Sequence, residues 1–314
     1  MLAAVGAPSA DNGQQHQLPK SKRARIDFDD SGQQHQLPKA KRARTDFDEP
    51  SCEDDASGAH AAVSYYPMKK KPHGYALIIN NKNFDGKPKW TRHGTDADRE
   101  NLDSVLTQLG YKVVLRKNLS RAEIEELFNE YGDTHDHKDY DSFVCCILSH
   151  GAEGQVYGSD TQLIKIRDLS RKLADCESLR GKPKIFFIQA CQGHEKPEQV
   201  PQPDHDREED SDPDKDVAFL PRDSDLFIGY ATTPETVALR HPKVGSWYIQ
   251  ELCEVLRNNM LGENKLDLVT MVTKVHHAVA AKREYCYKWT EGGKTHEYRQ
   301  QPQMISTLRH QVKF

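Results

Sequence analysis

Five short runs of apolar residues follow one another from Tyr75 onward, and helix-like segments separate several of them. The runs are YALIINN (75–81), KVVLRKN (112–118), SFVCCILSHG (142–151), KIFFIQACQG (184–193) and DLFIGYAT (225–232). Near-continuous apolar runs of this length indicate strands that are buried on both faces, as parallel sheets require. The pattern therefore predicts an α/β fold with a mainly parallel sheet and helices on both faces.

The segments between these runs carry helix signals. The stretch Thr95-Asp-Ala-Asp98 resembles a capping box, and leucine and valine residues follow it at helical spacing until Gly110. A second capping box, Ser120 to Glu123, precedes another amphipathic stretch. Residues 245–259 and 265–284 also have helical patterns, and MISTLRHQVKF at the C-terminus is a candidate sixth strand.

Residues 1–65 differ in composition from the rest of the chain. They contain a tandem repeat at 13–31 and 32–50 that is polar and glutamine-rich. Because such a segment buries too little apolar surface to offset its chain entropy, we expect a disordered prodomain. Its KRAR patches resemble nuclear-localisation motifs, and a merely solvated charged tail is the alternative interpretation. We expect a cytoplasmic protein that also enters the nucleus if these patches act as signals.

Several classes of protein are disfavoured by the composition. A net charge of -4 gives no support to a general nucleic-acid binder, and no apolar run is long enough to cross a membrane. Seven cysteines without a CxxC pair indicate reduced thiols rather than a disulfide framework or a zinc site. The segment NNKNFDGKPKW after the first run has no phosphate-binding glycine motif, which argues against a nucleotide-binding module. We therefore predict no metal and no cofactor.

A segment rich in proline, aspartate and glutamate interrupts the predicted domain at 194–224. Such composition is typical of an exposed linker, and this one directly follows the run that contains Cys191.

Two predicted strands end in residues whose side chains can take part in catalysis. One run ends in Ser149-His150-Gly151 and another in Gln189-Ala190-Cys191-Gln192-Gly193. Ligands of open α/β sheets bind beyond the carboxyl ends of the strands. A thiol beside an imidazole is a candidate nucleophile, whereas a lone buried cysteine is more often structural.

The pentapeptide QACQG favours the functional interpretation, because it matches the caspase signature with a histidine upstream, here His150. The chain resembles caspases from about Tyr65 to Phe314, in the stretches GYALIINNKNF, RHGTDAD, SHG, GKPKIFFIQACQG and RHPKVGSWYIQELC. This resemblance implies a protease of apoptosis-type signalling that cleaves proteins after aspartate. It also implies a large subunit (66–210), a cleavable linker (194–224) and a small subunit (217–314). Such subunit pairs dimerise through the last strand of each sheet, and an upstream caspase can activate them.

Carried over to this sequence, the resemblance makes Cys191 the nucleophile and His150 the general acid/base. Gly151 and Cys191 would supply the backbone N–H groups of an oxyanion hole. Arg92, Gln189 and Arg240 would form the pocket for the substrate aspartate, and paired guanidinium groups suit a carboxylate well. Leu239 stands where many caspases carry an aromatic residue, so we expect a roomier second pocket. Trp247 resembles the tryptophan near a more distant substrate residue.

Four aspartates have the surroundings expected of self-processing sites: Asp30, Asp55, Asp210 and Asp216. Acidic linkers also occur for solubility alone. No adaptor domain of six amphipathic helices is visible, and the resemblance associates this architecture with executioner caspases. The motif QACQG is instead more similar to that of initiator caspases. An inactive caspase homologue that acts as a scaffold or dimer partner is the alternative to an active protease.

Overall fold

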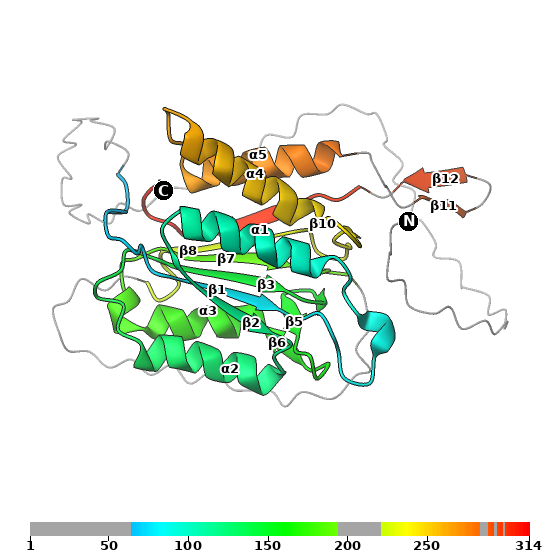
Figure 1. The fold of residues 1–314 in the computed structure, drawn as a ribbon, viewed down its shortest axis with the longest axis horizontal. Coiled ribbons are helices and arrows are strands. Elements are labelled where there is room, and N and C mark those ends of the chain that lie inside the picture. Colours follow the sequence, from blue (N-terminus) through cyan, green and yellow to red (C-terminus); the bar gives the residue numbers. More distant parts are fainter. Residues whose placement is uncertain (1–63, 194–220, 283–287, 292–293, 298) are drawn as a thin grey trace, which may run out of the picture. The chain divides into compact units, whose positions relative to one another are not determined.

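The computed structural model describes residues 64–193, 221–282, 288–291, 294–297 and 299–314. Within these ranges its centre is a six-stranded sheet in the order β13-β8-β7-β3-β1-β2 (Figure 1). Strands β1, β2, β3, β7 and β8 pair in parallel, and β13 pairs antiparallel with β8 at one edge. The predicted mainly parallel sheet of six strands is confirmed. The strands are β1 (Tyr75–Asn80), β2 (Lys112–Lys117), β3 (Phe143–Leu148), β7 (Lys184–Gln189), β8 (Leu226–Tyr230) and β13 (Gln303–Ser306).

Helices cover both faces of this sheet, as the sequence predicts (Figure 1). On one face lie α1 (Thr95–Gln108), α4 (Trp247–Leu261) and α5 (Leu268–Ala281). On the other lie α2 (Arg121–Asn129) and α3 (Ile166–Asp175). Three short helical turns complete the helical elements of the described ranges: η1 (Pro88–Trp90), η2 (Glu130–Thr134) and η3 (Glu177–Leu179).

Small antiparallel sheets were not predicted from the sequence. One contains β4 (Gly151–Ala152), β5 (Gln155–Tyr157) and β6 (Leu163–Lys165). Two others are the hairpins of β9 (Arg240–His241) with β10 (Gly245–Ser246) and of β11 (Lys288–Glu291) with β12 (Lys294–Glu297). Strands of two to four residues are too short to leave a periodic pattern in the sequence.

Every residue of β1, β3 and β7 is buried, which explains their continuous apolar runs. Successive side chains of a strand point to opposite faces. Ile78 thus packs in one core cluster with residues of α1, α4 and α5, and Leu77 packs in the other with residues of α2 and α3. Full burial of such a side chain contributes about 1.5–3 kcal/mol, so both layers of helices hold the sheet in place.

One of the two predicted capping boxes is confirmed. The Ser120 hydroxyl accepts a hydrogen bond from the Glu123 backbone, and the Glu123 carboxylate accepts one from the Ser120 N–H. The prediction for Thr95 is wrong. The N-cap residue of α1 is Gly94, which has a left-handed backbone conformation and no side chain that could cap the helix. The Thr95 hydroxyl instead hydrogen bonds to Asn80.

Part of the predicted organisation lies outside the described residues. This holds for residues 1–63 of the predicted prodomain, including Asp30 and Asp55, and for residues 194–220 of the predicted linker, including Asp210 and Asp216. In the part of the chain that the structure describes, no helix is both long enough and apolar enough to cross a bilayer.

A buried carboxylate joins three distant segments beside the start of β8. The Asp225 side chain is 1% exposed, and its Oδ1 atom accepts hydrogen bonds from the Tyr66 hydroxyl at 2.6 Å and from Arg309 Nε at 2.8 Å. Arg309 Nη2 donates to the Oδ2 atom at 2.9 Å. Burial alone would raise the pKa of Asp225, but the hydrogen bonds from Arg309 and Tyr66 outweigh it and hold the pKa below its ordinary value.

We expect Arg309→Ala to lower the free energy of unfolding by about 2 kcal/mol at pH 7, because it leaves a buried carboxylate short of donors. Urea denaturation monitored by circular dichroism measures this loss. The matched control is Arg222→Ala, whose ion pair with Asp175 is exposed, and its cost should stay below about 1 kcal/mol. A carboxylate with a lowered pKa stabilises the fold above the unfolded-state pKa and loses this effect as the pH falls. The loss in free energy of unfolding caused by Arg309→Ala should therefore shrink below about pH 4. Equal losses for Arg309→Ala and Arg222→Ala would contradict the stabilising role given to the Arg309–Asp225 contact.

Candidate active site

The carboxyl ends of β3 and β7 lie side by side. Leu148 pairs with Gln189 in the parallel register, and the Ser149 N–H donates to the Gln189 carbonyl at 3.2 Å. His150 and Cys191 each follow this pair by two residues, so the sheet brings both to the same edge. This is the edge of an α/β sheet at which ligands bind.

Gly151 allows the two strand ends to approach each other. A Cβ atom at this position would lie 2.9 Å from the Ala190 Cβ and 2.9 Å from the Cys191 carbonyl oxygen. Any side chain at position 151 would push the residue after the histidine away from the cysteine. The close contact therefore explains why glycine follows His150.

The His150 imidazole is held by one hydrogen bond and two aromatic rings. Its Nε2 atom lies 2.8 Å from the Trp90 carbonyl oxygen, and its ring lies 4.9 Å from Phe84 and 5.3 Å from Trp90 between centroids. Because a carbonyl only accepts, Nε2 must carry the proton, and the neutral ring has its free lone pair on Nδ1. Burial, followed by the positive charge of Arg92, lowers the pKa of His150 to about 3 against the opposing effect of the Trp90 carbonyl. The imidazole is thus neutral at physiological pH, with an unprotonated Nδ1 atom.

Cys191 differs from the other cysteines of the described ranges. Cys145, Cys146 and Cys253 are fully buried, and burial raises the pKa of each thiol, that of Cys253 to about 12. Those thiols are therefore core residues. Among the five cysteines described, Cys191 alone is partly exposed, and its sulfur interacts electrostatically with Arg92. The structure thus gives Cys191 the access to solvent that a nucleophile needs.

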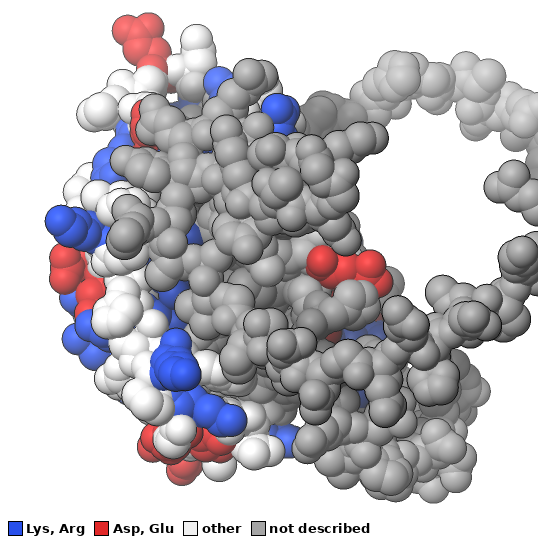
Figure 2. All heavy atoms as spheres, turned by 90° about the vertical axis from the view of Figure 1, so that its right-hand side faces the viewer, with Lys and Arg blue, Asp and Glu red and all other residues white. Residues whose placement is uncertain are grey.

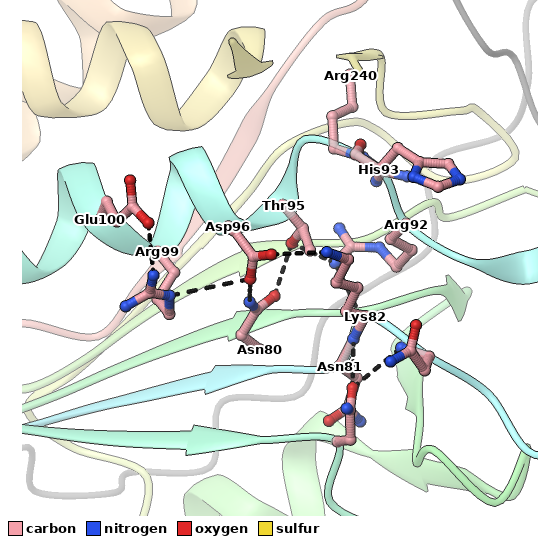
Figure 3. A network of polar contacts seen from close by, with 12 residues as sticks. Asn80, Asn81, Lys82, Arg92, His93, Thr95, Asp96, Arg99, Glu100 and Arg240 are labelled. Carbon is pink, nitrogen blue, oxygen red and sulfur yellow. Dashed lines mark hydrogen bonds and ion pairs between the residues drawn. The ribbon is translucent and has the colours of Figure 1, made fainter. Parts of the chain in front are cut away.

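Arg92 is fully buried beside Gln189. Its Nη1 atom donates to the Thr95 hydroxyl at 2.7 Å and to the Asn81 carbonyl at 3.2 Å (Figure 3). Its Nη2 atom donates to the Gln189 carbonyl at 3.4 Å. The buried polar atoms without a hydrogen-bond partner within the described residues include Arg92 Nε and the Gln189 side-chain oxygen Oε1. Buried polar groups are normally satisfied, so these atoms mark a place where a ligand can complete the bonding.

Arg240 approaches the same region from β9. Its Nε atom donates to the His93 carbonyl at 2.8 Å, next to Arg92 in sequence (Figure 3). Burial, followed by the like charge of Arg240, lowers the pKa of Arg92, and burial lowers the pKa of Arg240. Two neighbouring guanidinium groups with restricted hydration favour a negatively charged ligand. On the face of the molecule in Figure 2, the visible acidic and basic side chains are interspersed along the left margin.

Polar residues that the sequence analysis did not assign a role support this arrangement. Asn80 at the end of β1 accepts a hydrogen bond from the Thr95 hydroxyl at 2.7 Å, and Thr95 in turn accepts from Arg92 (Figure 3). Gln192 is 2% exposed, and its side-chain oxygen accepts a hydrogen bond from the Gly154 N–H at 2.9 Å. Polar residues inside or next to apolar strands were the only sequence signal for these roles.

The residues predicted for the more distant pockets lie in the core. Leu239 is 4% exposed and Trp247 is 3% exposed, and both belong to the cluster packed against α1, α4 and α5. The Leu239 N–H donates to the Gln300 side chain at 2.8 Å. The structure therefore joins Arg92, Gln189, Arg240, His150 and Cys191 at one edge, whereas contact of Leu239 and Trp247 with a substrate stays a prediction.

The tautomer and charge of His150 are open to direct measurement. In 15N-labelled protein, we expect the His150 ring to stay neutral with its proton on Nε2 from pH 5 to pH 8, because its pKa lies near 3. Long-range 1H–15N correlation spectra distinguish the Nε2-protonated tautomer from the Nδ1-protonated one. The His150 signals are assigned as those that are absent from the spectrum of His150→Gln. Titration of that resonance near pH 6.5 would contradict the described environment.

Comparisons with known proteins agree with this geometry. A family model described as the caspase domain matches residues 73–313. Caspase-8 of Mus musculus is 37% identical over 280 residues, which cover 84% of this chain and 55% of that protein. Caspase-3 of Mus musculus is 37% identical over 257 residues, which cover 80% of this chain and 87% of that protein. The crystal structure of caspase-1 from Spodoptera frugiperda matches with a TM-score of 0.65 and 32% identity, over 80% of this chain and 95% of that one.

The chain spans about half the length of the caspase-8 relatives that it matches. The family model nevertheless extends across both strand ends, both arginines and all five helices described above. From the match over residues 73–313 and the likeness of the fold, the chain belongs to the caspase family.

Proposed function

We propose that this protein is a cysteine endopeptidase that cleaves proteins after aspartate in apoptosis-type signalling. The observation that carries the proposal is the register of β3 with β7, which places His150 and Cys191 at one edge beside two arginines. Its placement in the caspase family, a family of aspartate-directed proteases, supports the same activity.

In the proposed reaction, the neutral His150 imidazole accepts the Cys191 proton on Nδ1, and the thiolate attacks the scissile carbonyl carbon. The backbone N–H groups of Gly151 and Cys191 stabilise the oxyanion that forms. His150 then donates its proton to the leaving amine, which departs as the thioester forms. Water, deprotonated by the same imidazole, attacks the thioester carbonyl carbon, and the carbon–sulfur bond breaks to release the new carboxyl terminus. The imidazolium returns its proton to the Cys191 sulfur, which restores the starting state.

The substrate aspartate would bind Arg92, Gln189 and Arg240. Its carboxylate would offset the two guanidinium charges and supply an acceptor for Arg92 Nε, which lacks a partner in the described residues. A carboxylate between two guanidinium groups makes strong, directional hydrogen bonds. An uncharged residue would leave buried cations unpaired, so the pocket would reject it strongly.

Activation by cleavage at aspartates is part of the proposal. We propose Asp210 and Asp216 as linker sites and Asp30 and Asp55 as sites that remove the N-terminal segment. Dimerisation of subunit pairs through β13 is proposed from the family, and β13 lies at an edge of the sheet. The cytoplasm, and the nucleus if the KRAR patches act as signals, are the proposed locations.

The peptidase activity can be tested with fluorogenic peptides that end in aspartate before the reporter group. We expect cleavage by the wild-type protein, a loss of at least about 10³-fold for Cys191→Ala, and a fall in kcat/KM of about 10²-fold for Arg240→Ala. Lys243→Ala, on the exposed turn between β9 and β10, is the matched control and should keep wild-type activity. Absence of cleavage with a folded wild-type protein would favour the inactive scaffold instead.

Self-processing makes a separate prediction. The wild-type protein expressed alone should separate into two fragments whose junction lies between residues 204 and 225, whereas Cys191→Ala should stay whole. N-terminal sequencing of the fragments identifies the aspartate used. Identical processing of both proteins would show that another protease makes the cut.

A further inference from the structure

Asp98 is a fully buried carboxyl group behind the two arginines. Its side chain on α1 is 0% exposed, and its Oδ1 atom accepts a hydrogen bond from the Ser246 N–H of β10 at 2.7 Å. Within the described residues, the Oδ2 atom has no hydrogen-bond partner. The group interacts electrostatically with Arg92 and Arg240, yet no hydrogen bond between Asp98 and either arginine is found among the described residues.

The surrounding backbone is shaped around this carboxyl group. Gly245 has a φ of +97°, and a Cβ atom there would lie 2.2 Å from Asp98 Oδ1. The hairpin of β9 and β10, which carries Arg240, therefore approaches α1 at the point where Asp98 sits. The bond from Ser246 to Asp98 and the bond from Arg240 to His93 both tie this hairpin to the segment of Arg92.

The charged and titratable groups near Asp98 come from several elements. Arg92 precedes α1, Arg240 lies on β9, and Cys253 on α4 has a neutral buried thiol. The Ser246 hydroxyl, buried and without a partner in the described residues, can donate to an ionised Asp98 or accept from the neutral acid. Burial raises the pKa of Asp98 to about 7, against the lowering effects of the Ser246 N–H and the two arginines. Both protonation states are therefore populated near neutral pH.

Substrate binding changes this balance. Ionised Asp98 and the two arginines together carry one net positive charge. The carboxylate of a substrate aspartate would bring a second negative charge to the same arginines. Two carboxylates that share a buried site repel each other, and the pKa of one of them rises. In the proposed pocket the substrate carboxylate would make the direct contacts with the arginines, so Asp98 would be the group that takes up the proton.

We propose that Asp98 is a positioning residue of the aspartate pocket that exchanges its charge with the substrate, taking up a proton from solvent when the substrate aspartate binds. Ionised Asp98 offsets one of the two guanidinium charges while the pocket is empty, and the substrate carboxylate takes over this role. The inference rests on the proposed function. By linkage, a group that binds a proton together with the peptide makes peptide affinity fall as the pH rises through the pKa of the empty pocket.

The test is isothermal titration calorimetry of the full chain carrying Cys191→Ala, which binds without hydrolysis. The probe is a short acetylated peptide with one aspartate, and the same peptide with asparagine is its control. Titrations at pH 7 in two buffers of different ionisation enthalpy should show uptake of about half a proton per bound aspartyl peptide. The dissociation constant should rise about eightfold from pH 6.5 to pH 8.

Asp98→Asn in this background keeps an oxygen for the Ser246 N–H and should abolish both the proton uptake and the pH dependence. The matched control is Asp96→Asn on the same helix, where a hydrogen bond from Lys82 already holds the pKa of the carboxyl low. That variant should take up protons like its parent. Uptake that persists in Asp98→Asn, or binding of the aspartyl peptide without uptake in the parent, overturns the role of Asp98.

Failure of both peptides to bind overturns the proposed aspartate pocket itself, a result distinct from binding without proton uptake. If Asp98→Asn does not fold by circular dichroism, infrared difference spectra of the parent decide the question. Binding of the aspartyl peptide should then produce a new band of a protonated carboxyl group. Absence of that band overturns the inference.

Discussion

Strand β3 pairs with β7 in parallel, and the pairing of Leu148 with Gln189 brings the carboxyl ends of both strands to one edge of the sheet. The sheet is buried on both faces, so a slip of one residue would exchange the side chains that face the two layers of helices. The register is therefore fixed by the hydrophobic core rather than by the site. His150 and Cys191 occupy their positions because the apolar strands beneath them cannot pair otherwise.

Electrostatics shape the rest of this edge. Arg92 is surrounded by carbonyl and hydroxyl oxygens from the end of β1, from Thr95 and from β7, so dipoles rather than a contacting carboxylate solvate its charge. The same positive charge helps to keep the His150 imidazole neutral. One buried guanidinium group thus favours an anion in the pocket and disfavours the imidazolium form of His150, because both effects come from the same positive field.

The sequence predicted the parts of the fold that depend on local pattern. Continuous apolar runs identified β1, β3 and β7, and the capping box at Ser120 was found as expected. Thr95 has a similar local signature, but its hydroxyl bonds to Asn80 because the chain enters α1 through Gly94. The role of Asp98 has no local signature at all, since its burial depends on Ser246, which lies 148 residues further along the chain. Motif resemblance identified Arg92 and Arg240, but their hydrogen bonds become visible only in three dimensions.

The network around Asp225 has a consequence for a chain that is cut between Gly193 and Pro221. On one side, the Gln192 backbone bonds to Thr236 and Glu235, which lie beyond the cut. On the other side, Asp225 bonds to Tyr66, which lies before it, and β7 and β8 continue to pair across the break. Residues of both pieces would thus pack in the same hydrophobic core. A nicked molecule would remain a single cooperative folding unit, and its two pieces would part only when the whole core unfolds.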